Sequence, residues 1–425
     1  MTEEFLHYLW KFRLLKRELL SRTGEPVTVI HPGEQNHNGG PDFLNARIRV
    51  GDTTWAGNVE IHINEGDWFR HNHHLDKVYE NVILHVVYEE DADFSERFEY
   101  NLPILVIKGQ FPEQIHDRYE DFLKNRLWIP CEHLIRNVEL FYFEQWSFAL
   151  LTERLGSRSG QWEKLFEANK FDWAETLFQS IARAFGLRIN TLPFELLAKA
   201  IPLKIVLKYK NNQFSLEALA FGQAGMLNRS FADEYPAKLK KEYDFLAGKY
   251  SLQPMDSSLW KFLRLRPSSF PTIRIAQWAA LLQRADRFFS SVLEFKTIDE
   301  IAELFSVQAS EYWESHFVFD KSSSIKPKIM GSSTIYLHIL NAVAPFLFFY
   351  GDYKGIKEDK EKAITLIEKV PGEKNTIITH WKQLGLPVDT ALYTQALIHL
   401  KTHYCDRKKC LECRIGNKLL VNNEK

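Results

Sequence analysis

The stretch GGPDFLNARIRVGDTTWAGNVEIHIN, residues 39–64, decides the fold of the N-terminal part of this 425-residue chain. It contains two runs rich in β-branched and apolar residues, 44–50 and 55–63. Gly51-Asp52 between them favours a tight hairpin. The stretch therefore predicts two adjacent antiparallel strands.

The second strand carries two chemically active side chains on one face. Glu60 and His62 alternate with apolar residues, so they point together away from the apolar face. Asp42 stands where the chain enters the preceding strand, after glycines that allow the backbone to approach a ligand closely. Strict alternation would put Asp42 on the same face as Leu44 and Ala46, so we expect it at a strand end or a bulge. We predict that Asp42, Glu60 and His62 converge on a metal ion.

Around this hairpin the pattern predicts a small α/β domain. The elements expected are a helix over 3–21, strands at 27–30, 82–88 and 102–107, a short helix within 65–80, and a helix over 112–127. Pro130-Cys131 closes this domain, which we place at residues 1–134. From about residue 138 onward the apolar periodicity is almost wholly helical, which predicts a mostly α-helical domain over 135–425.

Composition limits the classes of function. The chain has 54 basic and 55 acidic residues, so it has no overall positive field to attract nucleic acid, although a local basic groove remains open. The 14% aromatic content is explained first by core packing, because many of these residues lie in helical periods. No signal peptide pattern and no uninterrupted apolar stretch of ~20 residues is present, which predicts a cytoplasmic protein outside the membrane.

A helix followed by three strands, with Pro41-Asp42 opening the second and Glu60-Ile61-His62 on the third, resembles the PD-(D/E)xK nuclease superfamily. The resemblance implies a restriction-endonuclease-like core of order αβββαβ. It also implies that Asp42 and Glu60 hold Mg²⁺ or Mn²⁺, and that His62 takes the place of the lysine. Imidazole could act as a base or as a softer metal ligand, which makes Zn²⁺ credible as well.

Further polar residues surround this trio. Seven of the 15 histidines fall between His31 and His85. Glu34 could add a carboxylate and Asn36 a hydrogen bond to metal-bound water, although a polar turn explains Asn36 equally well. His71 and His73 could fold over the site, or belong to a solvated loop. A core residue with one hydrogen bond is the favoured interpretation of His85.

The cysteines form a second motif. Cys405, Cys410 and Cys413 have the short spacing of metal ligands, with either His403 or Cys131 as the fourth ligand. Structural Zn²⁺, an iron-sulfur cluster and reduced cysteines without metal all stay open.

Three arginines, Arg264, Arg266 and Arg274, bracket Pro267 and Phe270-Pro271 ahead of a predicted helix. Their cationic side chains could gather near a helix start suited to phosphate, and ordinary surface salt bridges explain them equally well.

Several segments together are similar to an uncharacterised bacterial family of unknown function over nearly the whole chain, among them GGPDFLNARI, WAGNVEIHI, DWFRHNHH and YCDRKKCLECRIG. That similarity transfers no activity. Our first hypothesis is a metal-dependent nuclease-like hydrolase acting on the phosphodiester bonds of nucleic acid. The alternatives are a His/carboxylate metal-site enzyme using His62, His71 and His73 on a small molecule, and a catalytically inactive nucleic-acid-binding or scaffold protein.

Overall fold

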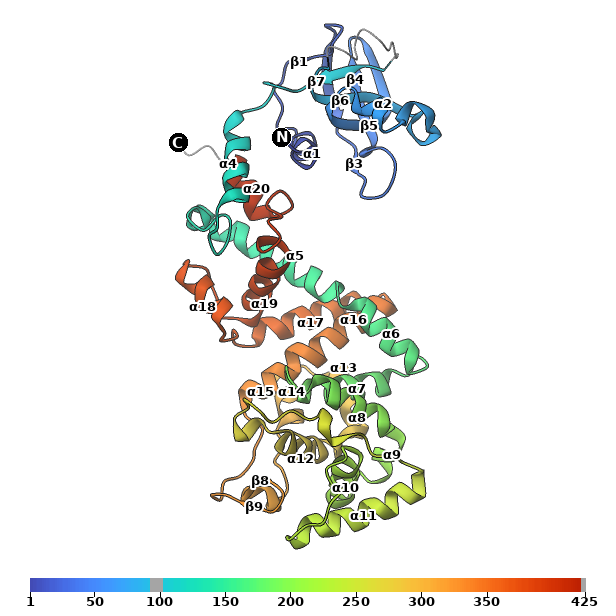
Figure 1. Ribbon diagram of the computed structural model, residues 1–425, viewed down its shortest axis with the longest axis vertical. Helices are drawn as coiled ribbons and strands as arrows, with labels where there is room; N and C mark the ends of the chain where they lie inside the picture. Colours follow the sequence, from blue (N-terminus) through green and yellow to red (C-terminus); the bar gives the residue numbers. More distant parts are fainter. Residues whose placement is uncertain (92–101, 422–425) are drawn as a thin grey trace. The chain divides into compact units, whose positions relative to one another are not determined.

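The computed structural model describes residues 1–91 and 102–421 and divides the chain into two compact units (Figure 1). Unit 1 comprises Met1–Phe143 and Lys401–Lys425, and unit 2 comprises Glu144–Leu400. The C-terminal segment with its three cysteines therefore groups with the N-terminal unit, whereas we had assigned it to the helical domain by its position in the sequence.

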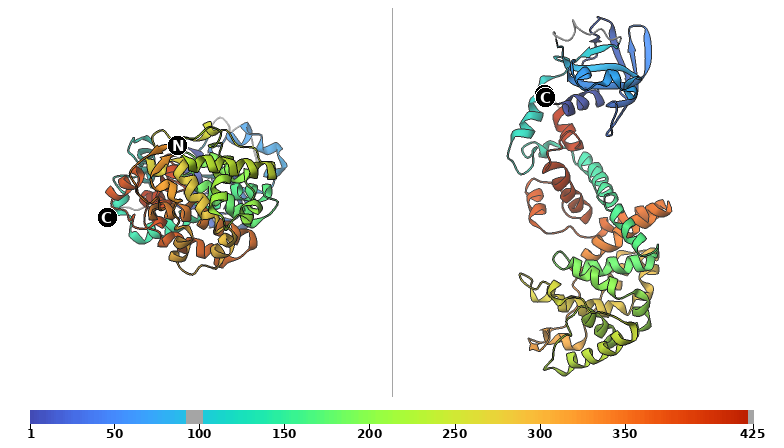
Figure 2. Two further views of the ribbon diagram at one scale, coloured as in Figure 1. Left: turned by 90° about the horizontal axis from the view of Figure 1, so that it is seen from below. Right: turned by 45° about the vertical axis from the view of Figure 1, so that its right-hand side comes forward.

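Unit 1 is built on a mixed sheet with strand order β1-β2-β4-β5-β6-β7, and β3 pairs with β4 (Figures 1 and 2). The strands are β1 (Leu19–Leu20), β2 (Pro26–His31), β3 (Glu34–Gln35), β4 (Phe43–Val50), β5 (Thr53–Asn64), β6 (Val82–Glu89) and β7 (Ile104–Val106). The pairs from β1 to β5 are antiparallel, and β5-β6 and β6-β7 are parallel. The predicted hairpin at Gly51-Asp52 is confirmed.

A bulge in β4 sets the facing of its side chains. The pairing with β5 shifts between Phe43 and Ala46, and Asn45 between them has a left-handed backbone with φ 58°. Phe43, Ala46 and Ile48 are consequently all buried, although strict alternation would separate Phe43 from the other two. Asp42, one residue before the strand, is thereby released from the apolar face.

Helix α1 spans Glu3–Lys11 and packs against β5 (Figures 1 and 2). The predicted helix over 3–21 was too long, because Arg13 takes a left-handed backbone with φ 52° and the Leu14 amide bonds back to the Leu9 carbonyl. The predicted short helix within 65–80 is present as α2 (Asp67–Arg70), followed by two 3-10 turns, His73–Leu75 and Lys77–Tyr79.

Two further helices complete unit 1. Helix α4 (Glu113–Lys124) packs against α20 (Arg414–Val421). Arg118 in α4 donates to the carbonyls of Leu419 and Leu420, each at 3.4 Å, where α20 leaves its last carbonyls without partners inside the helix. Residues near the two ends of the chain are thus joined within one unit.

Unit 2 is almost wholly helical, as predicted. Its helices are α5 (Leu140–Gly156, starting in unit 1), α6 (Ser159–Ala168), α7 (Trp173–Phe185), α8 (Thr191–Ala200), α9 (Leu203–Lys208), α10 (Gln213–Gln223), α11 (Glu234–Tyr250), α12 (Pro271–Leu282), α13 (Phe288–Glu294), α14 (Ile298–Phe305), α15 (Ser332–His338), α16 (Ala344–Lys354), α17 (Lys357–Lys369), α18 (Thr376–Gln383) and α19 (Ala391–His399). The largest fully buried side chains are all Trp or Phe, which confirms core packing as a main use of the aromatic residues.

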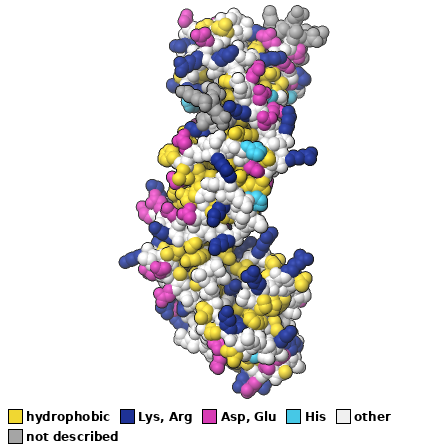
Figure 3. Space-filling view, turned by 90° about the vertical axis from the view of Figure 1, so that its left-hand side faces the viewer, with side chains coloured by type: hydrophobic (Ala, Val, Ile, Leu, Met, Phe, Trp, Pro, Cys, Tyr) yellow, Lys and Arg dark blue, Asp and Glu magenta, His cyan; other side chains and the backbone are white. Residues whose placement is uncertain are grey.

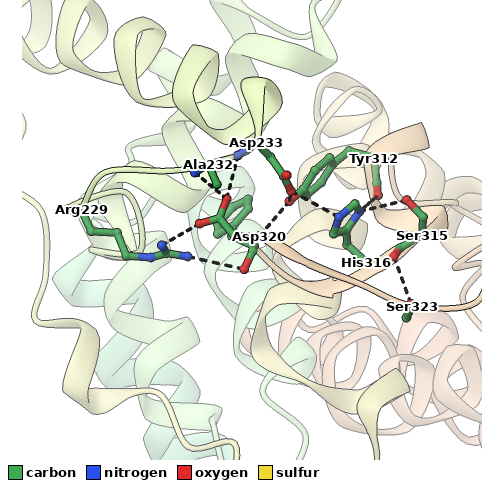
Figure 4. Close-up of polar contacts among 9 residues, drawn as sticks. Arg229, Ala232, Asp233, Tyr312, Ser315, His316, Asp320 and Ser323 are labelled. Carbon is green, nitrogen blue, oxygen red and sulfur yellow. Dashed lines mark hydrogen bonds and ion pairs between the residues drawn. The ribbon is translucent and has the colours of Figure 1, made fainter.

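Unit 2 also contains a small hairpin formed by β8 (His316–Val318) and β9 (Lys321–Ser322). A network of polar contacts holds this hairpin to the rest of the unit (Figure 4). Asp320 at its tip accepts from the Asp233 amide at 3.0 Å and pairs with Arg229 at 2.7 Å. Asp233 in turn accepts from the Tyr312 hydroxyl at 2.7 Å and lies 3.3 Å from His316 Nε2. The Nδ1 atom of His316 faces the Tyr312 carbonyl at 2.9 Å, so its ring joins the hairpin to the preceding turn.

One helical stretch, Ser332–Lys354, is long and apolar enough to span a membrane by length and composition. Its apolar window is 67% buried inside the fold, which is the pattern of a core helix. The stretch runs through α15, a π-helical turn at Ile339–Val343, and α16. The sequence does not show this stretch as one uninterrupted apolar run, because polar residues interrupt it. A cytoplasmic location stays a prediction.

We predict that Gly57→Ala destabilises unit 1 by about 1–3 kcal/mol, because overpacking forces backbone shifts. A Cβ atom at Gly57 would lie 2.5 Å from Ile83 Cγ2 and 2.6 Å from the Asn81 carbonyl oxygen. Urea unfolding of the full chain measures the change. Gly39→Ala is the matched control, since no atom lies within 4 Å of its Cβ. Equal unfolding midpoints for the two variants would contradict the close approach at Gly57.

Candidate metal centre

At the end of the β4-β5 pair, two hydrogen bonds from backbone amides anchor the carboxylates of Asp42 and Glu60. The Asp42 amide donates to Glu60 Oε2 at 3.1 Å, and the Ile61 amide donates to Asp42 Oδ2 at 3.0 Å. Each carboxylate is therefore held by the backbone of the other strand. The two acidic groups predicted from the sequence are brought together as a fixed pair.

Three histidines complete this group. His62 follows Glu60 on β5, while His71 and His73 come from the turns after α2, where Asn72 has a left-handed backbone with φ 61°. One ligand nitrogen from each of the three imidazoles lies within 4.8 Å of the others. Asp42, Glu60, His62, His71 and His73 are called the histidine–carboxylate cluster below.

Glu60 is the point at which the cluster's two kinds of ligand meet. Its Oε1 atom lies 3.3 Å from His73 Nε2 and 3.5 Å from His62 Nε2. Glu60 and His62 are buried, His73 is half-buried and His71 is exposed. The cluster thus has a buried floor and one imidazole at the solvent side. The three imidazoles are close enough to one another to share a cation, and the Glu60 carboxylate lies beside two of them.

Burial disfavours the charged forms of Glu60, His62 and His73, and this shifts their pKa values. Burial, followed by the charge of Asp42, raises the pKa of Glu60 to about 9. Burial, followed by His73, lowers the pKa of His62 to about 4. Burial also lowers the pKa of His73, whose Nε2 atom is buried without a hydrogen bond in the described part of the chain. Without a cation, a protonated Glu60 and neutral imidazoles are therefore favoured.

Two residues orient the imidazoles from outside the cluster. His85 on β6 is fully buried, and its Nε2 lies 2.9 Å from His62 Nδ1, so His62 directs its other nitrogen toward Glu60. Tyr79 stacks on His73 with ring centroids 3.9 Å apart. Both contacts restrict the rotation of a cluster ring.

Helix α1 contributes residues that the sequence interpretation missed. His7 Nε2 lies 3.2 Å from Asp42 Oδ2. Burial, followed by the charge of Asp42, raises the pKa of Glu3, which places this carboxyl near the cluster. Glu3 and His7 are spaced i, i+4 and share a face of the helix. That spacing is the only feature of the sequence that could have identified Glu3 and His7 as site residues. The apolar periodicity of the same helix is a stronger pattern, and it indicates only core packing.

Glu34 and Asn36 lie in the turn before Asp42. Glu34 is exposed in β3 opposite Leu44, and none of the described contacts joins its carboxylate to the histidine–carboxylate cluster. Asn36 donates to the carbonyls of Gly39 and Pro41, at 3.2 and 3.0 Å. Asn36 therefore shapes the polar turn.

The C-terminal segment of unit 1 docks close to Cys131. Lys408 donates to the Asn125 carbonyl at 3.1 Å, and the ammonium of Lys401 lies 5.0 Å from the centre of the Trp128 ring. The two lysines lie on either side of Cys405 in the sequence. The residues that they contact lie three to six positions before Cys131. The fourth cysteine of the chain and the clustered three are consequently neighbours in space.

The cysteines in this region, called the thiol cluster, are Cys131, Cys405, Cys410 and Cys413. The structure records none of these four in a disulfide, and Cys410 and Cys413 are each 7% exposed. The Cys413 amide donates to the Cys410 carbonyl at 3.3 Å and closes a turn between them. Burial, followed by the charge of Cys413, raises the pKa of the other three thiols, that of Cys410 to about 12. Cys413 thus lies close enough to the other three thiols to disfavour their ionisation.

Comparison with known proteins gives a family. The family described as "Protein of unknown function (DUF2851)" matches residues 3–376 of the 425-residue chain. Searches of curated proteins and of solved structures returned no match.

We predict that Glu60→Gln stabilises the metal-free protein at pH 8 and has little effect at pH 4. In the wild type the folded state keeps its proton on Glu60 up to about pH 9, whereas the unfolded chain releases it near 4.5. The unfolded state thus binds fewer protons between these values, so wild-type stability falls as pH rises. The glutamine side chain of the variant cannot ionise, and its carbonyl oxygen can still accept the Asp42 amide.

Urea unfolding after chelation of metal, at pH 5 and pH 8, measures this effect. The advantage of Glu60→Gln should grow by up to ~1.4 kcal/mol per pH unit. Glu34→Gln, which changes an exposed carboxylate of the same unit, is the control without such a trend. An equal effect of Glu60→Gln at both pH values would contradict the buried, protonated carboxyl.

Proposed function

The chain belongs to the DUF2851 family, and we propose that it is a metal-dependent hydrolase whose histidine–carboxylate cluster binds one divalent cation. The observation that carries the proposal is the convergence of the Asp42–Glu60 pair with three imidazoles at one end of the sheet. A bound cation would activate water as the nucleophile.

The residues present fit such a cation. Metal ligands must be an ionised carboxylate and neutral imidazoles. His62 is already neutral at pH 7, and a cation would favour the ionised form of Glu60 that burial disfavours. It would also bind the buried His73 Nε2, which makes no hydrogen bond in the described part of the chain. Three nitrogens favour Mn²⁺ or Zn²⁺ over Mg²⁺, which prefers oxygen ligands.

The roles of the residues follow from their contacts. His62, oriented through His85, and Glu60 would hold the cation from the buried side. His71, which is exposed, would complete the set at the side where substrate enters. Asp42 is anchored by the Ile61 amide and lies beside His7, so it would serve as a further ligand or accept a proton from the nucleophilic water.

A phosphodiester of nucleic acid is the substrate class that we propose. The support is the chain order of a helix, three antiparallel strands, a short helical segment and a parallel strand, with Asp42 before the second main strand and Glu60-x-His62 on the third. With the two-residue strands β1 and β3 set aside, this order is similar to the αβββαβ order that the resemblance to PD-(D/E)xK nucleases implies.

A small-molecule ester or phosphate is the second candidate. It is favoured by the three imidazoles, because a Mg²⁺ site built on an Asp/Glu pair does not need imidazole ligands. Figure 3 adds that Lys and Arg side chains on one face are scattered among acidic and apolar ones, without a continuous basic stripe. Substrate screening separates the two candidates.

We predict that Glu60→Gln and Asp42→Asn each lower metal-dependent cleavage at least ~100-fold, because the carboxylates hold the cation. The assay follows cleavage of single- and double-stranded DNA and RNA, and of bis(p-nitrophenyl) phosphate, with Mn²⁺, Zn²⁺ or Mg²⁺. Asp52→Asn makes the same chemical change in the β4-β5 turn, at the opposite end of the hairpin, and should keep full activity. Cleavage that survives in both site variants would exclude the proposed centre.

We also propose that the thiol cluster binds a structural Zn²⁺ ion. Four thiols from two distant parts of the chain are gathered in unit 1, and each thiolate would raise the pKa of its neighbours. A divalent cation removes this repulsion, and Cys₄ is a common set of ligands for structural zinc. The bound ion would tie residue 131 to the C-terminal segment.

We predict that Cys410→Ser removes about one equivalent of zinc per chain and lowers the melting temperature of unit 1, because metal binding contributes to folding. Elemental analysis and calorimetry measure both effects. Glu60→Gln is the matched control, since it should empty the histidine–carboxylate cluster and keep the thiol-bound zinc. Unchanged zinc content in Cys410→Ser would rule out the site, and visible absorbance with bound iron would assign an iron-sulfur cluster instead.

A further inference from the structure

A cavity of about 230 Å³ lies in unit 2 beside the first turn of α12. Its lining contains four arginines and no acidic residue; the arginines are Arg188, Arg264, Arg266 and Arg274. Phe185 and Phe194 form part of the apolar wall. Cations that line one cavity without a carboxylate create a positive potential that attracts anions.

Arg274 is the decisive residue, because its charge is buried without an anionic partner. It is 7% exposed, and its guanidinium donates to two neutral oxygens, Gln277 Oε1 at 2.9 Å and Thr334 Oγ1 at 3.3 Å. Its Nε atom is buried with no hydrogen bond in the described part of the chain. Burial lowers its pKa to about 10, so the group is still a cation at pH 7.

A buried cation destabilises a fold by several kcal/mol unless a charge pairs with it. Protein groups do not supply that charge here, since none of the ion pairs in the described residues involves Arg274. An anionic ligand in the cavity would supply the missing opposite charge.

The other three arginines differ from Arg274 in exposure. Arg188, Arg264 and Arg266 are exposed, and none of them joins an ion pair among the residues that the structure describes. They stand at the rim, while Arg274 stands at the floor. The cavity also meets Pro271, the first residue of the 12-residue helix α12, whose first-turn amides add positive potential.

We propose that this cavity binds a small phosphate monoester. Arg274 is one of the residues that line the cavity, and its planar guanidinium matches the oxygens of a phosphate. Two negative charges of a monoester suit four arginines better than the single charge of a carboxylate or a backbone phosphodiester. The volume is below the ~300–1,000 Å³ of typical drug-sized sites, which favours a small ligand. This binding function goes beyond the hydrolase proposed for unit 1.

Calorimetric titration in phosphate- and sulfate-free buffer tests the proposal with three probes: inorganic phosphate, adenosine monophosphate and a single-stranded oligonucleotide. The wild-type chain should bind the first two at millimolar concentration or below. Arg274→Gln should weaken this binding at least tenfold and Arg266→Gln a few-fold. Arg287→Gln, an exposed arginine outside the cavity, should change nothing.

The melting temperature separates ligand binding from a purely structural role of Arg274. Without phosphate, Arg274→Gln should melt at or above the wild-type temperature, because it removes a buried charge that lacks a partner. Phosphate should raise the melting temperature of the wild type and leave that of Arg274→Gln unchanged. If Arg274→Gln fails to fold, the effect of phosphate on the melting temperature is measured instead for Arg266→Gln, whose substituted side chain is exposed.

Three results would overturn the proposal. They are no binding of inorganic phosphate or adenosine monophosphate by the wild type, unchanged binding in both arginine variants, and an Arg274-dependent affinity that is higher for the oligonucleotide than for the monophosphate. The last result would assign the cavity to the backbone of nucleic acid.

Discussion

The two backbone hydrogen bonds that anchor the carboxylates of Asp42 and Glu60 are the constraint on which the geometry of the candidate site depends. Each carboxylate accepts a backbone amide of the neighbouring strand, so the strand pairing and the acidic pair determine each other. Asp42 can take this position only because the β4 bulge at Asn45 turns Phe43 toward the core and Asp42 away from it. A single left-handed residue thus converts an apolar strand entrance into one wall of a polar site.

Both proposed centres follow from the same physical imbalance, which is a buried ionisable group without an opposite charge. Glu60 is buried beside neutral imidazoles, and Arg274 is buried beside neutral oxygens. In each case the protein bears a cost that a ligand of the right charge removes, a cation for Glu60 and an anion for Arg274. Groups of this kind are retained where function requires them, since an apolar residue would be more stable in the empty fold.

The role proposed for the thiol cluster is different, because a metal there would join segments that are distant in the sequence. Cys131 follows the sheet-containing part of unit 1, and the other three thiols come from the last residues described. Contacts of Lys408, Lys401 and Arg118 already hold this C-terminal segment in place. A metal bound there would reinforce a closure that hydrogen bonds and packing have begun.

The sequence by itself determined the order of elements, the β4-β5 hairpin and the pairing of Glu60 with His62, because period-2 alternation and turn residues are local properties. Local patterns also predicted the helical nature of unit 2, in which Pro202 separates α8 from α9. Only the tertiary structure decided which distant groups meet: His7 with Asp42, His71 and His73 with His62, Cys131 with the C-terminal thiols, and Arg274 with a cavity free of acids. The reason is that such contacts depend on chain reversals at left-handed residues such as Asn45 and Asn72, and on burial. Neither leaves a periodic signal in one sequence.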